Sequence, residues 1–416
     1  MSTLSTAGVA QSATPVASSN ASRVVSIDIF RGLTIAVMIF VNELAEVRGL
    51  PWWTYHAHAN QDVMTYVDMV FPFFLFILGM SLPHSVEQRL KRNPSRPLLW
   101  MHVMVRSFSL LVLGLILANA EKADRARMGM SGSWWALLGL IGAGLYLNVY
   151  PKPRKTYMTA LRIIGLLAVV VAFAIFRRTT QDGSAGWIDF SYPEILGLIA
   201  FAYFAVALLY IPTCRWRWAA PAWFVLLLSL NVCSTARLVP FLGRLSNYVW
   251  PFGNGSHVAL VMAGVVTSQI FFGLRPGADE RPAAKTASIT AVGFALFAFA
   301  AGWLCGPLGI SKIRATPAWT LWNAGAAVLT FTLLYWICDL WRTTAWAAPV
   351  QPAGSNTLLT YLLPDLWYFV LGAVGFTWME THFSFAWAGV VKSVLFTFLM
   401  LGLAWLLTRA RVRFQL

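Results

Sequence analysis

A histidine and an aspartate stand ten residues apart at the start of a long apolar run. His58 precedes Asp68, which opens the segment DMVFPFFLFILGM (68–80), and Asn42 closes the apolar run before it. Histidine is the side chain that titrates closest to neutral pH, and a polar group at membrane depth is costly enough that a function is the default hypothesis. These residues predict a catalytic site in which His58 is the general base or nucleophile and Asp68 sets its tautomer. Asn42 would then hydrogen-bond the reacting oxygen or orient the ring; the alternative is that it bonds a neighbouring helix.

The loop that joins the two apolar runs (48–68) carries aromatic residues and a second histidine. Either histidine alone could be an exposed loop residue. The neighbourhood of Asn42 and Asp68 favours His58, and His56 is the second choice. Trp53 either belongs to an interfacial aromatic belt or stacks on a sugar ring.

The first apolar run also has a charged pair at its other end. Asp28 and Arg31 lie three residues apart, so on a helix they share a face and can neutralise each other. The alternative is that Arg31 binds a phosphate, because its planar guanidinium matches that geometry. Asn42 would lie about 21 Å further along the same helix axis from Asp28, at 1.5 Å per residue. One helix would therefore connect a charged end to a polar end.

The composition places these residues in a membrane protein. Of 416 residues, 58% are hydrophobic and 11% are charged, whereas soluble domains carry about 25% charged residues. Apolar runs of about 20 residues, long enough to span hydrocarbon, recur along the chain. We expect an all-α polytopic bundle of about twelve spans. The expected spans are 27–47, 65–85, 99–119, 133–150, 157–176, 194–211, 219–236, 256–273, 286–306, 317–341, 355–372 and 386–408.

Basic residues alternate between the loops and set the expected orientation. One set of alternate loops and termini holds seventeen Lys and Arg residues and the other holds ten. The positive-inside rule puts the richer set in the cytoplasm, so both termini are predicted to be cytoplasmic and His58 to face the opposite side. The net charge of +15 therefore points to topology and lipid headgroups rather than to nucleic acid.

Residues 1–22 are rich in Ser, Ala and Thr and predict a disordered tail. Residues 23–416 contain no long linker and are taken as one membrane domain, with 133–176 as an extra helical pair. The four cysteines lack paired spacing, and no motif for a metal or a Gly-rich phosphate loop is present. Neither a disulfide framework nor a metal site is expected.

Two N-terminal motifs resemble the heparan-α-glucosaminide N-acetyltransferase family and its bacterial membrane relatives, and two later elements agree. The first motif is met by Arg23, Ser26, Asp28, Phe30, Arg31, Gly32, Met38 and Asn42, and the second by His58, Thr65, Asp68, Val70, Phe71, Pro72, Phe74, Phe76 and Gly79. The later elements correspond to Lys312, Trp319, Thr320 and Leu321, and to Gly354, Asn356, Thr357, Leu358 and Tyr361.

The resemblance implies a transfer of acetyl from cytoplasmic acetyl-CoA to the amine of glucosamine, or of a related amino sugar, at the periplasmic side of a bacterial inner membrane. It implies that His58 is catalytic with Asn42 beside it. The acetyl-CoA site is expected at Arg31, Asp28, Ser26 and Asn356, and the sugar site at Trp53, His56, Lys312 and Arg314. Asn356 is also a plausible helix cap. A homodimer is one of the arrangements that we expect for the chain.

This chain departs from the family pattern in several places. The loop from Asn42 to His58 is longer, and Asn60-Gln61-Asp62 replaces the family's Trp-Asn-Gly. A permease for N-acetylglucosamine or other amino sugars fits twelve spans as well. Conversion of glucosamine and acetyl-CoA to product by the purified protein separates the two hypotheses.

Overall fold

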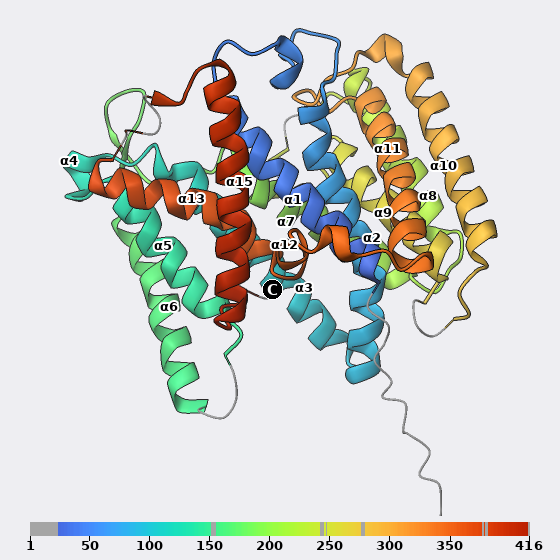
Figure 1. The fold of residues 1–416 in the computed structure, drawn as a ribbon, viewed down its shortest axis with the longest axis horizontal. Coiled ribbons are helices and arrows are strands. Elements are labelled where there is room, and N and C mark those ends of the chain that lie inside the picture. Colours follow the sequence, from blue (N-terminus) through green and yellow to red (C-terminus); the bar gives the residue numbers. More distant parts are fainter. Residues whose placement is uncertain are drawn as a thin grey trace, which may run out of the picture.

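The computed structural model is an all-α bundle in which twelve of the described helices have seven or more residues (Figure 1). It describes residues 24–150, 155–241, 245–246, 248–275, 279–376, 378 and 382–414. The predicted tail at 1–22 lies outside these residues. A short antiparallel hairpin, β1 (Arg178–Thr179) with β2 (Ala185–Gly186), is the sheet among them.

The long helices correspond in order to the twelve apolar segments expected from the sequence. They are α1 (Val25–Ala45), α2 (Val70–Arg92), α3 (Arg96–Ala120), α5 (Gly132–Leu147), α6 (Lys155–Ile175), α7 (Glu194–Thr213), α8 (Ala219–Thr235), α9 (Ser256–Phe272), α10 (Ala284–Leu304), α11 (Pro317–Tyr335), α13 (Thr357–Val374) and α15 (Ala386–Arg409). Shorter helical elements include η1 (Trp52–Thr54), η2 (Tyr66–Met69), α4 (Arg125–Met128) and α12 (Gln351–Ser355).

The lengths of these helices make the chain a multi-pass membrane protein. Nine of the described helices are long and apolar enough to cross a bilayer. The other three, α5, α8 and α9, have 16 or 17 residues. Whether these three cross the membrane completely stays a prediction, as does the assignment of the cytoplasmic face.

The loops gather into two groups, as the expected topology requires. In Figure 1 the loop before α2 lies at the same end of the bundle as the loops before α11 and α15. Side-chain contacts join loops of this group to one another, and other contacts join segments of the opposite group. In the first group these are His56–Lys312, Lys122–Asp189 and Tyr248–Phe190; in the second they are Asn148–Arg413 and Asn356–Val412. We call the end that carries His56 the outer face and the opposite end the inner face.

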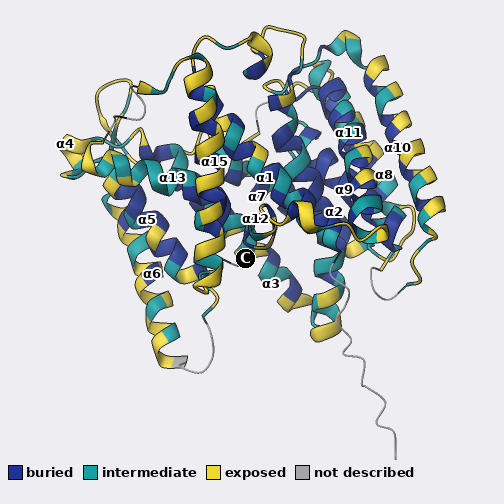
Figure 2. Cartoon of the chain, viewed as in Figure 1, coloured by how far each residue is buried: buried dark blue, intermediate teal, exposed yellow. Residues whose placement is uncertain are grey.

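The centre of the bundle is built on the close approach of α2 and α9. Figure 2 shows buried residues concentrated on the central helices, whereas α6 and α10 at the sides expose much of their surface. Gly79 of α2 and Gly264 of α9 lie at the crossing. A Cβ at Gly79 would overlap the carbonyl oxygen of Val261, and one at Gly264 would overlap that of Phe76. The two glycines therefore allow backbone contact, and this contact holds the outer ends of α2 and α9 side by side.

Candidate active site

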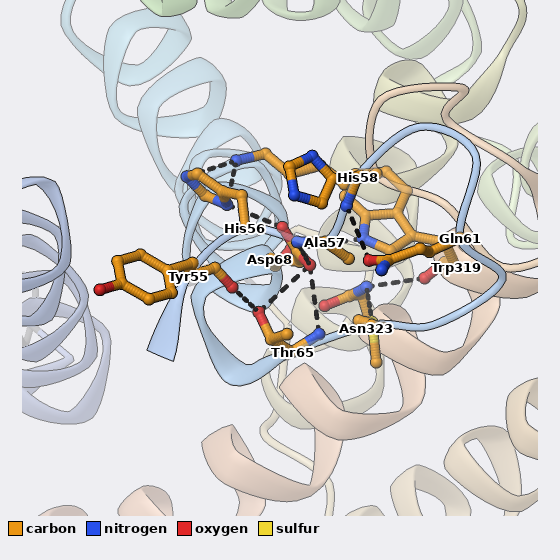
Figure 3. Close-up of polar contacts among 11 residues, drawn as sticks. Tyr55, His56, Ala57, His58, Gln61, Thr65, Asp68, Trp319 and Asn323 are labelled. Carbon is orange, nitrogen blue, oxygen red and sulfur yellow. Dashed lines mark hydrogen bonds and ion pairs between the residues drawn. The ribbon is translucent and has the colours of Figure 1, made fainter. Parts of the chain in front are cut away.

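Asp68 is fixed where the chain enters α2. Its side chain reaches back to the start of η2, where its Oδ2 accepts hydrogen bonds from the backbone N (3.1 Å) and the Oγ1 (3.2 Å) of Thr65 (Figure 3). This is a capping box, in which a side chain three residues into a helix satisfies the first free backbone N–H. The backbone N of Ala57 donates to the same oxygen at 3.3 Å. Asp68 is 1% exposed, so its orientation is set by these bonds and not by solvent.

The second carboxylate oxygen of Asp68 binds His56. The distance from His56 Nδ1 to Asp68 Oδ1 is 2.7 Å, which is a short, charge-assisted contact. The side chain of His56 is 40% exposed, whereas that of Asp68 is almost completely buried. A buried carboxylate that accepts from Nδ1 leaves Nε2 as the basic nitrogen. His56 and Asp68 therefore form a histidine–carboxylate dyad at the outer face.

The prediction that Asp68 pairs with His58 is wrong. His58 is exposed, and it forms a tight turn with Gln61: its backbone N donates to Gln61 Oε1 at 3.2 Å, and its carbonyl accepts from Gln61 N at 3.0 Å. The loop is also tied at Tyr55, whose carbonyl accepts from Thr65 Oγ1 at 2.9 Å. These two sets of bonds place His56 against Asp68. The spacing of ten residues does not show which histidine contacts Asp68, because the turn at His58–Gln61 takes up part of the chain between them.

Lys312, which was expected to bind the sugar, lies against His56. Its Nζ is 3.2 Å from Nδ1 and 3.3 Å from Nε2 of the ring. Burial lowers the pKa of the Lys312 ammonium, and the negative charge of Asp68 partly offsets this effect. Two residues further on, Arg314 forms an ion pair with Asp62. The loop before α11 therefore supplies one cation beside the dyad and uses another to hold the loop before α2.

Helix α11 and helix α9 form the wall behind the dyad. Trp319 is buried, and its Nε1 donates to the backbone carbonyl of Asp68 at 3.3 Å. Asn323, one turn later, donates to Met64 Sδ at 3.1 Å. The ring of His257 lies edge-on to Phe71 and Trp319. Trp319 was part of a recognised motif, but nothing in the sequence linked Asn323 or His257 to this loop.

A cavity of about 250 Å³ lies on the inner side of the bundle. Arg31 lines it and donates to Ser81 Oγ (2.6 Å), to the carbonyl of Gly354 (3.2 Å) and to Asp28 (3.1 Å). Arg31 therefore pairs with Asp28, as the first reading expected, and also faces a cavity; the binding of a phosphate by Arg31 stays a prediction. Arg106 of α3 lines the same cavity, and its Nε has no hydrogen-bond partner within the described part of the chain. The two guanidinium groups make this cavity suited to an anion.

Two of the expected acetyl-CoA residues, Ser26 and Asn356, make contacts that hold segments of the protein together, and their part in binding acetyl-CoA stays a prediction. Ser26 is fully buried, and its backbone N donates to Asp339, which accepts from the first turn of α1. The Asn356 side chain does not cap α13. Its Nδ2 donates to Thr408 Oγ1 (3.0 Å) and to the carbonyl of Val412 (2.8 Å), and its Oδ1 accepts from the backbone N of Phe414 (3.1 Å). These bonds hold the C-terminal segment, and Phe414 in turn lines the inner cavity.

A larger cavity, of about 740 Å³, lies between α1, α3, α7, α13 and α15 toward the outer face. Asn42 lines it. The adjacent Glu43 forms a buried ion pair with Lys392 (2.8 Å) and accepts from the hydroxyl of Tyr368. Tyr361 lines this cavity and also the inner one. The two cavities are therefore neighbours that meet at Tyr361.

The loop that carries the dyad is joined to the rim of the outer cavity. Glu46 and Arg48 line that cavity, and the carbonyl of Val47 between them accepts from the Tyr55 hydroxyl at 2.6 Å. Tyr55 is the residue before His56. Among the described residues, no hydrogen bond joins Asn42 to either histidine. Trp53 is 53% exposed, so its role in sugar stacking stays a prediction.

Comparisons with known proteins find similarity over part of the chain and over a small part of the length of the relatives. The family described as a domain of unknown function (DUF5009) matches residues 23–241. The chain is 38% identical over 101 residues to heparan-alpha-glucosaminide N-acetyltransferase from Mus musculus, which is 24% of this chain and 15% of that protein. The identity to the Homo sapiens protein of the same name is 38% over 97 residues, which is 23% of this chain and 14% of the relative.

Proposed function

The chain belongs to the DUF5009 family, and from this premise and the geometry around His56 we propose that it is a transmembrane acetyltransferase. The proposed donor is acetyl-CoA from the inner face, and the proposed acceptor is the amine of an amino sugar at the outer face. The partial similarity to heparan-alpha-glucosaminide N-acetyltransferase supports the reaction class. The observation that carries the proposal is the dyad of His56 and Asp68, held at 2.7 Å at the outer face.

In the proposed reaction the dyad supplies the base. Nδ1–H of His56 donates to Asp68, and Nε2 takes the proton that the amine loses as its nitrogen attacks the thioester carbonyl. The new C–N bond forms, the C–S bond breaks, and the leaving thiolate takes up a proton. A two-step route through an acetyl group on His56 uses the same atoms. Lys312 lies close enough to the ring to stabilise negative charge on the carbonyl oxygen.

The two cavities that meet at Tyr361 support a route for the donor. Arg31 and Arg106 suit the phosphates of CoA at the inner end. Asn42 lies eleven residues beyond Arg31 on α1, or about 17 Å along the helix axis. The narrow arm of the donor would extend past Tyr361 into the outer cavity, which Asn42 lines and where its amide would hydrogen-bond the carbonyl oxygen.

Two histidines in one loop provide a matched test. Purified protein in detergent would be given acetyl-CoA and glucosamine, and free CoA and acetylated sugar would be measured. We expect His56→Ala to lower turnover by about 10²–10⁴-fold, and His58→Ala, two residues away and exposed, to change it little.

The outcomes are distinct. Loss of turnover in His58→Ala with normal turnover in His56→Ala would reject the proposed dyad. Wild-type protein that forms no product, but carries labelled sugar into liposomes without acetyl-CoA, would instead support a permease.

A further inference from the structure

A second depression on the outer face lies apart from the dyad. It has a volume of about 390 Å³, within the range of about 300–1,000 Å³ for ligand pockets. Aromatic rings and small polar side chains from the segment before α7, the end of α8 and the segment before α9 line it. They include Phe190, Ser191, Ser234, Ser246, Tyr248, Trp250 and Asn254. We call this depression the aromatic pocket.

The aromatic side of the pocket is held in place by contacts among its own residues. The ring of Tyr248 meets those of Phe190 (5.7 Å between centroids) and Phe201 (5.4 Å) edge-on. Its hydroxyl donates to the carbonyl of Phe190 at 2.9 Å. Trp250 Nε1 donates to the carbonyl of Gly253 at 2.9 Å, which fixes the indole. The rings are therefore ordered before any ligand binds, which reduces the entropic cost of binding.

The polar side combines hydroxyl groups with one amide. Asn254 is anchored because its Nδ2 donates to the carbonyl of Ala315 at 3.0 Å, and its Oδ1 accepts from the backbone N of Ser256 at 3.1 Å. The Oδ1 retains a second lone pair. Ser234 and Ser246 add hydroxyl groups that can donate or accept. Hydroxyls facing aromatic rings match a sugar, which has a ring of hydroxyl groups and flat C–H faces.

The aromatic pocket continues toward the dyad. A smaller pocket of about 190 Å³ shares Gly253 and Asn254 with it and ends at His257. The ring of His257 contacts that of Trp319, which donates to the carbonyl of Asp68. Asn254 is bonded to the loop that carries Lys312, the cation beside His56. The two pockets therefore lie next to His257, Trp319 and the loop before α11, which contact the dyad residues.

We propose that the aromatic pocket is a saccharide-binding subsite, in which a sugar ring stacks on Tyr248 and Trp250 and hydrogen-bonds Asn254 and Ser234. Aromatic side chains offer a large rigid apolar surface with a polar edge, which suits such a ligand. This inference rests on the proposed function for the identity of the ligand. It adds a binding surface for a sugar unit that is connected to the reacting amino sugar.

The test measures binding without acetyl-CoA, so it does not depend on catalysis. Titration calorimetry would compare glucosamine with its β-1,4-linked dimer as probes, using the full chain in detergent. We expect the wild type to bind the dimer at least tenfold more tightly than the monomer. Trp250→Ala should abolish this difference. Ser234→Trp, which fills the pocket from α8 without altering the aromatic loop, should do the same.

The control is Trp216→Ala, which removes an exposed indole (67% exposed) between α7 and α8, outside the aromatic pocket. Equal binding of the two probes to the wild type, or tight dimer binding that persists in both pocket variants, would overturn the inference. A protein that binds the dimer through Trp250 but forms no acetylated product would refute the proposed reaction and leave the subsite standing.

Discussion

The buried ion pair of Glu43 and Lys392 beside the outer cavity allows a quantitative prediction about the stability of the protein. The two side chains are 4% and 6% exposed, and the distance from Nζ to Oε1 is 2.8 Å. The Tyr368 hydroxyl donates to both carboxylate oxygens, at 2.7 and 2.6 Å. Replacement of Lys392 by Met keeps most of the side-chain volume but removes the positive charge. Glu43 is then left with a single neutral donor among these three residues.

The expected cost follows from the burial of the charge. Removal of one partner from a buried ion pair typically costs about 3–5 kcal/mol, because the remaining charge is not compensated. At about 1.4 kcal/mol per factor of ten, the ratio of folded to unfolded protein falls by between about a hundred- and several thousand-fold. Glu43→Gln together with Lys392→Met leaves no charge and retains an acceptor for Tyr368. The double variant should therefore recover most of the lost stability, since replacing both charges is often neutral.

The assay is reversible unfolding in mixed micelles, followed by tryptophan fluorescence. Lys91→Met is the matched control, because Lys91 is 48% exposed and lies 3.7 Å from Glu87 on the surface of α2. Exposed pairs contribute less than about 1 kcal/mol. If Lys392→Met unfolds with the same free energy as the wild type, Glu43 is neutral or hydrated in the variant. This result would refute the argument that an uncompensated charge on Glu43 is costly. A double variant as unstable as the single one would assign the loss to packing.

Three further predictions follow from the site and the fold. Asp68→Asn should lower turnover nearly as much as His56→Ala, because the amide NH₂ facing Nδ1 favours the tautomer with a proton on Nε2. The check is kcat at saturating acetyl-CoA, measured on protein that still unfolds cooperatively on heating. Gly79→Ala should cost about 1–3 kcal/mol because its Cβ would overlap the Val261 carbonyl. Gly402→Ala should not destabilise the protein, because the position of its Cβ is open space. Thermal unfolding of both variants in detergent measures this difference. Burial lowers the pKa of Lys312, so the folded state holds its proton less tightly than the unfolded state. The free-energy cost of burying the charged Lys312 is present below the folded pKa and disappears as the pH rises through 10.5. Lys312→Met should therefore be more stable than the wild type at neutral pH, and the difference should vanish in alkali. A difference in melting temperature that stays constant across this pH range would contradict the lowered pKa of Lys312.

The helices of this protein could be predicted from its sequence because their lengths are set locally. In a bilayer every backbone polar group must be satisfied within its own segment, so an apolar run of about 20 residues predicts a helix directly. All twelve expected segments are helical, including 133–150, which is cut short at Leu147. The orientation of the Asp68 side chain is also determined locally, because Asp68 and Thr65, three residues before it, form a capping box.

The tertiary structure alone decided which residues meet across the bundle. The choice between His56 and His58 depends on a loop whose path is set by Tyr55, Thr65 and Gln61, and residue spacing along the chain does not measure such a path. The partners of Glu43 are separated from it by more than 300 residues, on helices α13 and α15. Hydrophobicity predicts that a segment is buried, but it carries no information about which neighbour it faces. The helices of this bundle are therefore determined by local composition, whereas the cavities and the dyad arise from packing between distant segments.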